Sequence, residues 1–145
     1  MTPGSAAQTA VELLRNAAVT DGSREAYVDP FCRLTFAEWD RAADGLAAEL
    51  HDQGVSPGDV VALVLPSSAD YAVCYQAVMR LRAITTGINP RLGPTEVGSI
   101  LDRTVPRVVV REGDLPAVRA AYGRTAIADL PVPQRDDPVA IRSEE

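Results

Sequence analysis

The chain has 145 residues and a formal net charge of −6, with apolar residues at 46% and charged residues at 23%. These values fit one globular domain, exclude wholesale disorder, and argue against nucleic acid and anionic membrane surfaces as partners. All fourteen positive residues are Arg, so a Lys Schiff base, a phosphate-loop Lys and Lys-dependent adenylation are excluded within this chain.

The first part of the chain predicts helical and extended segments in alternation. We expect a helix at 7–19, short extended pieces at 26–29 and 33–36 joined by a turn, and a helix at 36–53. The signal for helix 36–53 is the strongest, because Thr35 and Glu38 form a capping-box pattern and apolar residues recur on one face. Gly54 suits the end of this helix.

The remaining chain alternates strands with helices. We expect strand 59–65, helix 68–82, strand 83–88, a turn at 89–94, helix 94–104, strand 107–110, helix 115–122 capped by Asp114, and strands at 125–130 and 138–141. The continuous apolar run at 59–65 is typical of a strand buried on both faces. The fold class is therefore α/β, a parallel sheet of at least four strands with flanking helices.

No catalytic constellation is visible in the sequence. It contains no GxGxxG after a strand, no GxxxxGK[ST] and no GxSxG, and one His excludes a multi-His metal site. His51 is interpreted as a solvated residue near a helix end, although a triad would have to use it. Cys74 is interpreted as a core residue, and Cys32, beside Arg33, as a weak candidate for a reactive thiol. There is no secretory signal and no transmembrane segment, so we expect a cytoplasmic protein.

Several other polar and aromatic residues have a structural and a functional interpretation. Trp39 lies on the apolar face of its helix and is expected in the core. Asp136 and Asp137 lie in a Pro-rich stretch and more readily start a turn than bind a metal. Ser67 and Ser68 follow strand 59–65, at the sheet edge where ligands bind in open α/β folds, but helix capping also explains them.

Arg91 is the main candidate binding residue. It lies in the NPRLGP turn after strand 83–88, at the same carboxyl edge of the predicted sheet. An Arg in that position can donate two parallel hydrogen bonds to a phosphate. The alternative is an ordinary exposed loop Arg.

The order of these segments resembles a known family. The similar stretches are LTFAEWDRAADGLAAEL, GVSPGDVVALVLPSS and INPRLGPTEVGSILDRTVPRVVV, which together cover about 33–110. They resemble the N-terminal part of the large domain in the adenylate-forming (AMP-binding) superfamily. That superfamily includes acyl- and aryl-CoA synthetases, peptide-synthetase adenylation domains and luciferases; the NPRL turn is most similar to the CoA ligases.

The resemblance implies an activity for the full-length family. Such enzymes join a carboxylic acid to ATP, release pyrophosphate, and pass the acyl group from the adenylate to coenzyme A. ATP, Mg and coenzyme A are therefore implied for the family. In an aryl-CoA ligase of this group, the Arg of the NPRL turn contacts a coenzyme A nucleotide phosphate, and the corresponding residue here is Arg91.

Three departures from the family pattern stand out. Arg82 replaces a Gly before the strand at 83–88, which predicts an altered start of that strand or a snorkelling side chain. Gly87 stands where relatives often have Pro, which predicts a less restrained backbone. After PVAI the family continues into a Ser/Thr/Gly-rich phosphate loop, whereas this sequence continues with RSEE.

Two hypotheses follow for the whole of 1–145. The first is an incomplete N-terminal portion of an acyl-CoA synthetase large domain, with no catalytic residues and no cofactor of its own, and inactive alone. The alternative is a stand-alone module that binds coenzyme A or a partner, through self-association or a C-terminal half that covers the open sheet. A peptide-synthetase fragment fits less well, because those proteins usually carry a different turn in place of INPRLGP.

Overall fold

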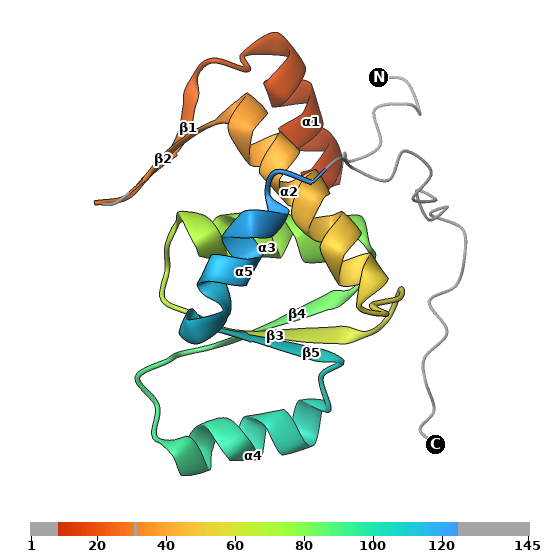
Figure 1. Ribbon diagram of the computed structural model, residues 1–145, viewed down its shortest axis with the longest axis vertical. Helices are drawn as coiled ribbons and strands as arrows, with labels where there is room; N and C mark the ends of the chain where they lie inside the picture. Colours follow the sequence, from red (N-terminus) through yellow and green to blue (C-terminus); the bar gives the residue numbers. More distant parts are fainter. Residues whose placement is uncertain (1–8, 31, 125–145) are drawn as a thin grey trace, which may run out of the picture.

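The computed structural model describes residues 9–30 and 32–124 (Figure 1). The helices are α1 (Ala10–Thr20), α2 (Phe36–Asp52), α3 (Ala69–Arg80), α4 (Pro94–Thr104) and α5 (Leu115–Ala121), with a 3₁₀ turn η2 (Glu112–Asp114) before α5. The strands are β1 (Glu25–Val28), β2 (Arg33–Thr35), β3 (Val60–Val64), β4 (Ile84–Ile88) and β5 (Val108–Arg111). The predicted strands at 125–130 and 138–141 lie outside the described residues.

The main sheet of the described chain has three strands in the order β4–β3–β5, and both pairs are parallel. β1 and β2 form a separate antiparallel pair. Helices α3 and α4 connect the parallel strands as the crossovers that such pairing requires. The α/β class with flanking helices is confirmed, whereas the expected fourth strand falls beyond residue 124.

Helices cover both faces of the sheet. In Figure 1, α2, α3 and α5 lie on one face and α4 on the other. β3 supplies both layers: Val61 and Leu63 enter the core beneath α2 and α3, while Ala62 and Val64 pack with residues of α4. All four side chains are buried, which confirms the interpretation of the apolar run as a strand enclosed on both sides.

The capping box predicted for α2 is formed. The Thr35 hydroxyl accepts from the Glu38 backbone N–H at 3.1 Å, and the Glu38 carboxylate accepts from Thr35 N–H at 2.9 Å. These hydrogen bonds hold the pKa of Glu38 below its ordinary value. Trp39, one position further, donates from Nε1 to the Ala72 carbonyl of α3 at 3.0 Å. Trp39 thus joins α2 to α3, as expected for a core residue.

Arg80 joins α3 to α2 through a buried ionic network. Its side chain is 3% exposed. Its guanidinium lies 2.7 Å from Asp40 Oδ1 and 2.8 Å from Asp44 Oδ1, and it also donates to the Asp40 carbonyl. Arg15 of α1 donates to the same Asp44 carboxylate at 2.7 Å. The three N-terminal helices are therefore fastened at one point, and the carboxylates offset the desolvation of Arg80.

Helix α5 is fastened by ion pairs nearer the surface. Asp70 accepts from Arg119 at 2.6 Å and from the Tyr122 hydroxyl at 2.8 Å. Arg124 pairs with two carboxylates of α2, on Glu49 and Asp52. The predicted capping of α5 by Asp114 is wrong: that carboxylate accepts from the Arg111 backbone N–H across η2, and no side chain caps α5.

Two residues without glycine's freedom adopt left-handed backbone conformations. Arg82, between α3 and β4, has φ of 56°, and Val105, at the end of α4, has φ of 46°. Both conformations are costly for residues with a Cβ, and most of all for β-branched Val. The expected altered start of the strand at Arg82 is therefore a strained turn, and its carbonyl accepts from Gly58 N–H.

Candidate functional site

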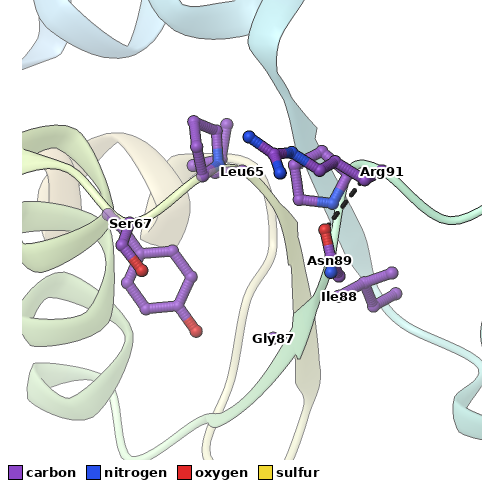
Figure 2. A pocket seen from close by; sticks show the side chains of 9 residues that line it. Leu65, Ser67, Gly87, Ile88, Asn89 and Arg91 are labelled. Carbon is purple, nitrogen blue, oxygen red and sulfur yellow. Dashed lines mark hydrogen bonds between the residues drawn. The ribbon is translucent and has the colours of Figure 1, made fainter.

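The carboxyl ends of β3 and β4 lie side by side because the two strands run parallel in register, with Val64 opposite Ile88. A hollow of about 500 Å³ opens between the loops that leave these ends (Figure 2). It is lined by Leu65, Pro66, Ser67, Tyr71, Gly87, Ile88, Asn89, Pro90 and Arg91. Ligands of open α/β sheets bind at this edge.

The loop after β4 presents Arg91 to the hollow through a tight turn. The Asn89 side-chain oxygen accepts from the Arg91 backbone N–H at 2.9 Å, and the Asn89 carbonyl accepts from Leu92 N–H at 3.1 Å. Figure 2 shows the Arg91 guanidinium pointing toward Leu65. Asn–Pro turns favour this geometry, because the Asn side chain bonds to the backbone two residues on. Arg91 is exposed and forms no ion pair within the described chain.

The two serines after β3 differ in role: Ser68 caps a helix, and Ser67 lines the hollow. The Ser68 hydroxyl caps α3 by accepting from Tyr71 N–H at 3.2 Å, as the capping interpretation predicts. A second N–H at the start of this helix, on Ala69, donates to the Asp29 carboxylate at 2.8 Å. Two of the first backbone donors of α3 are therefore already used. Ser67 is exposed and, of the two serines, is the one that lines the hollow with Arg91.

Tyr71 and Gly87 form the wall between α3 and β4. A Cβ built at Gly87 would collide with the Tyr71 hydroxyl oxygen. Gly87 does not have a positive φ, so its requirement is for space. The sequence did not single out Tyr71, because it reads as one more apolar position of a buried helix. Its place in the first turn of α3, directly after the loop that carries Ser67, is the signal that could have placed it near the carboxyl edge of the sheet.

The hollow offers hydrogen-bond donors and no acidic side chain. Among its lining residues the polar side chains are Ser67, Tyr71, Asn89 and Arg91, and none is Asp or Glu. This composition contrasts with the whole chain, which has twenty acidic residues and a net charge of −6. Hydroxyl, amide and guanidinium groups around one opening can together bind an anion, and a guanidinium suits phosphate geometry in particular.

The other sequence candidates do not converge on a site. His51 is exposed near the end of α2, with Nδ1 3.9 Å from Asp52 Oδ1, in agreement with the solvated interpretation. Burial raises the pKa of the Cys74 thiol to about 12. Partial desolvation, with Asp29 and Asp70 nearby, also raises the pKa of Cys32. Neither thiol is activated, since a reactive thiol needs a lowered pKa.

Residues 9–30 and 32–124 contain neither a metal-binding group nor a membrane-spanning helix. Within these ranges no group of three or more His, Cys, Asp or Glu side chains is placed to hold a metal ion. In the same ranges, no helix combines the length and the apolar character needed to span a bilayer. Asp136 and Asp137 lie outside the described residues.

The family profile and the individual relatives that match this chain agree with one another. The profile of the family described as AMP-binding enzyme matches residues 14–143. The chain is similar to the long-chain-fatty-acid–CoA ligase FadD13 of Mycobacterium tuberculosis, at 33% identity over 68% of this chain and 20% of the relative. It is also similar to a 4-chlorobenzoate–CoA ligase of Arthrobacter, at 34% identity over 72% of this chain and 20% of the relative.

Solved structures agree with this similarity. The N-terminal domain of FACL13 from Mycobacterium tuberculosis superposes with a TM-score of 0.67 at 30% identity, covering 79% of this chain and 30% of that one. The N-terminal subdomain of NpsA from Klebsiella oxytoca superposes with a TM-score of 0.76 at 17% identity, covering 87% and 34%, and supports the fold alone. The chain spans about a fifth of the length of FadD13 and of the 4-chlorobenzoate–CoA ligase.

Proposed function

We propose, from the premise that this chain belongs to the AMP-binding enzyme family, that it supplies the coenzyme A phosphate-binding wall of an ATP-dependent acid–CoA ligase. The hollow between β3 and β4 takes a phosphate of the coenzyme A nucleotide, and Arg91 is its principal contact. The observation that carries the proposal is a hollow lined by Arg91 and neutral polar side chains, with no Asp or Glu, in a chain that is otherwise acidic.

The relatives support coenzyme A as the ligand. FadD13 and the 4-chlorobenzoate enzyme are both described as CoA ligases, one for long-chain fatty acids and the other for an aromatic acid. They share the cosubstrate and differ in the acid. We therefore assign the hollow to coenzyme A, the cosubstrate that both names share, and to neither acid.

The proposed role of Arg91 is electrostatic and geometric. Its guanidinium donates two parallel hydrogen bonds to phosphate oxygens. The Asn89 side chain holds the backbone of Arg91 in the turn, which reduces the backbone entropy lost on binding. Ser67 and Asn89 supply neutral donors beside it. Binding of this kind orients the thiol carrier; it does not activate the carboxylic acid.

Acyl-adenylate formation belongs, in this proposal, to the remainder of the large domain and to the small domain. That step needs cations arranged around the ATP phosphates. The chain has no Lys. We therefore expect the 145-residue chain to show no ATP–pyrophosphate exchange with any carboxylic acid by itself. Measurable exchange by the pure chain would contradict this part of the proposal.

The alternative, a stand-alone binding module, shares the same hollow. It differs in predicting that the chain completes its sheet with a second copy or with a separate polypeptide. β4 and β5 are the outer strands of the described sheet, and Ile84 on β4 is 51% exposed. Sedimentation of the pure chain at several concentrations distinguishes the ligase portion from the stand-alone module.

A cytoplasmic location, in keeping with the free thiols of Cys32 and Cys74, is part of the proposal for the ligase portion and of the proposal for the stand-alone module.

Calorimetric titration of the chain with coenzyme A tests the function directly. The expected result is saturable binding by the parent chain and about tenfold weaker binding by Arg91→Gln, since one charge-assisted interaction is removed. Arg24→Gln is the matched control, because it removes the same charge from an exposed residue remote in sequence from the hollow. Equal affinity for all three proteins would contradict the role of Arg91.

A further inference from the structure

The hollow contains a second donor whose position depends on a glycine. The Tyr71 hydroxyl occupies the space that a Cβ at residue 87 would need. The backbone of Gly87 does not require glycine, since its φ is not positive. The feature at residue 87 that matters is therefore the absent side chain, which admits the phenol against the end of β4.

The Tyr71 side chain is held in place by the core. Its ring packs against the buried cluster beneath α2 and α3, and its backbone N–H is fixed by the Ser68 cap. A ring fixed in this way loses little conformational entropy when its hydroxyl binds a ligand. The hydroxyl is consequently a preorganised donor at the inner wall of the hollow.

The hydroxyl is also available. Within the described part of the chain the Tyr71 hydroxyl makes no hydrogen bond, whereas the Tyr122 hydroxyl donates to Asp70 at 2.8 Å. Tyr71 is half-buried and lines the hollow together with Ser67 and Arg91. A phenol without a hydrogen-bond partner, in the same lining as the Arg91 cation, can be satisfied by an anionic ligand.

We propose that Tyr71 is a ligand-binding residue of this hollow, that its hydroxyl donates a hydrogen bond to the phosphorylated ligand bound by Arg91, and that Gly87 makes this contact possible. This inference rests on the proposed function, because it takes coenzyme A as the ligand. The inference adds a determinant of ligand specificity, in which Tyr71 of α3 and Gly87 of β4 act together.

A double-mutant cycle on coenzyme A binding tests the inference. Tyr71→Phe removes only the hydroxyl, and Gly87→Ala displaces it. Each change is expected to weaken binding of coenzyme A about tenfold, as for a hydrogen bond to a charged group. The double variant is expected to bind no more weakly than either single variant, because both changes remove the same contact.

Control variants distinguish loss of this hydrogen bond from loss of the folded structure. Tyr75→Phe makes the same chemical change one turn further along α3, on a side chain that does not line the hollow, and should leave affinity unchanged. Thermal unfolding of every variant verifies that the helix and sheet persist. Arg91→Gln, titrated in parallel, reports the proposed function separately.

The outcomes are distinct. Tyr71→Phe with parental affinity, beside a weakened Arg91→Gln, overturns the role of Tyr71 and leaves the proposed function standing. Additive losses in the double variant overturn the coupling of Gly87 to the hydroxyl. Absence of coenzyme A binding by the parent chain overturns both the inference and the function on which it rests.

Discussion

Arginine occupies two contrasting settings in this molecule, the helical layer above the sheet and the carboxyl edge of the sheet. Arg80 is buried between α2 and α3 and meets two carboxylates within 2.8 Å. Arg91 is exposed beside a hollow without acidic side chains. In a chain without Lys, arginine both joins helices and offers a cation to the surface. Whether an arginine does one or the other depends on whether carboxylates surround it.

Removing Arg80 should have the largest effect on stability. Arg80→Met removes the buried cation that Asp40 and Asp44 share, leaves them only the more exposed Arg15, and should lower the free energy of unfolding by about 3 kcal/mol. Urea denaturation measures this change. Arg41→Met, on the exposed side of α2, is the matched control and should change stability by about 0.5 kcal/mol or less. A loss below about 1 kcal/mol for Arg80→Met would show that the network does not fasten the helices.

Asp70 provides an intermediate case, where the arginine is exposed and the carboxylate is largely buried. Hydrogen bonds from Arg119 and Tyr122 hold the pKa of Asp70 below its ordinary value. A carboxyl of this kind stabilises the fold above its unfolded pKa of about 3.9, and the contribution is lost as pH falls through the lower folded pKa. Asp70→Asn should therefore lower stability by about 1 kcal/mol at pH 7.

The pH dependence gives a sharper test of Asp70 than the single value at pH 7. The stability difference between the parent chain and Asp70→Asn should be constant from neutral pH to about 5 and should shrink below about 4. Denaturation at a series of pH values measures it, with Asp102→Asn on the exposed face of α4 as control. A difference that stays constant down to pH 2 would mean that the Asp70 charge does not stabilise α5.

Arg82 represents a third setting, in which the backbone and not the charge matters. Its φ of 56° is unfavourable for a residue with a Cβ. Arg82→Gly should therefore raise the free energy of unfolding by about 1 kcal/mol. Arg82→Ala removes the same charge and keeps the strain, so it should give no such gain. Equal stability of the two variants would show that the strained turn has no cost.

Arg91→Lys should have the smallest effect and separates charge from geometry. The ammonium keeps the positive charge but cannot donate the two parallel hydrogen bonds of a guanidinium. We expect coenzyme A binding about threefold weaker and unchanged stability, measured by calorimetry and thermal unfolding. Loss as large as that of Arg91→Gln would mean that geometry, not charge, accounts for the whole contact.

The elements were largely predictable from local sequence signals. The Thr35–Glu38 capping box and the apolar run of β3 determine their elements through residues close in sequence, so their interpretation is confirmed. Asp114 was misread because its carboxylate has a competing backbone donor three residues earlier. The Arg80 network could not be seen, because its partners lie 36 and 40 residues away on another helix.

The candidate site was predictable in part. Parallel strand order alone places the loops of Ser67 and Arg91 at one edge, and the structure confirms that both line one hollow. Tyr71 was missed, because its helix is apolar almost all round and aromatic residues there indicate core. Its role depends on the space left at Gly87, which only the packing of α3 against β4 reveals.

A crystal structure of the 145-residue chain with coenzyme A tests the central claim most directly. The account predicts a nucleotide phosphate in the hollow, with its oxygens about 2.8 Å from the Arg91 guanidinium nitrogens. A phosphate bound elsewhere on the molecule, or an empty hollow under saturating coenzyme A, would contradict it.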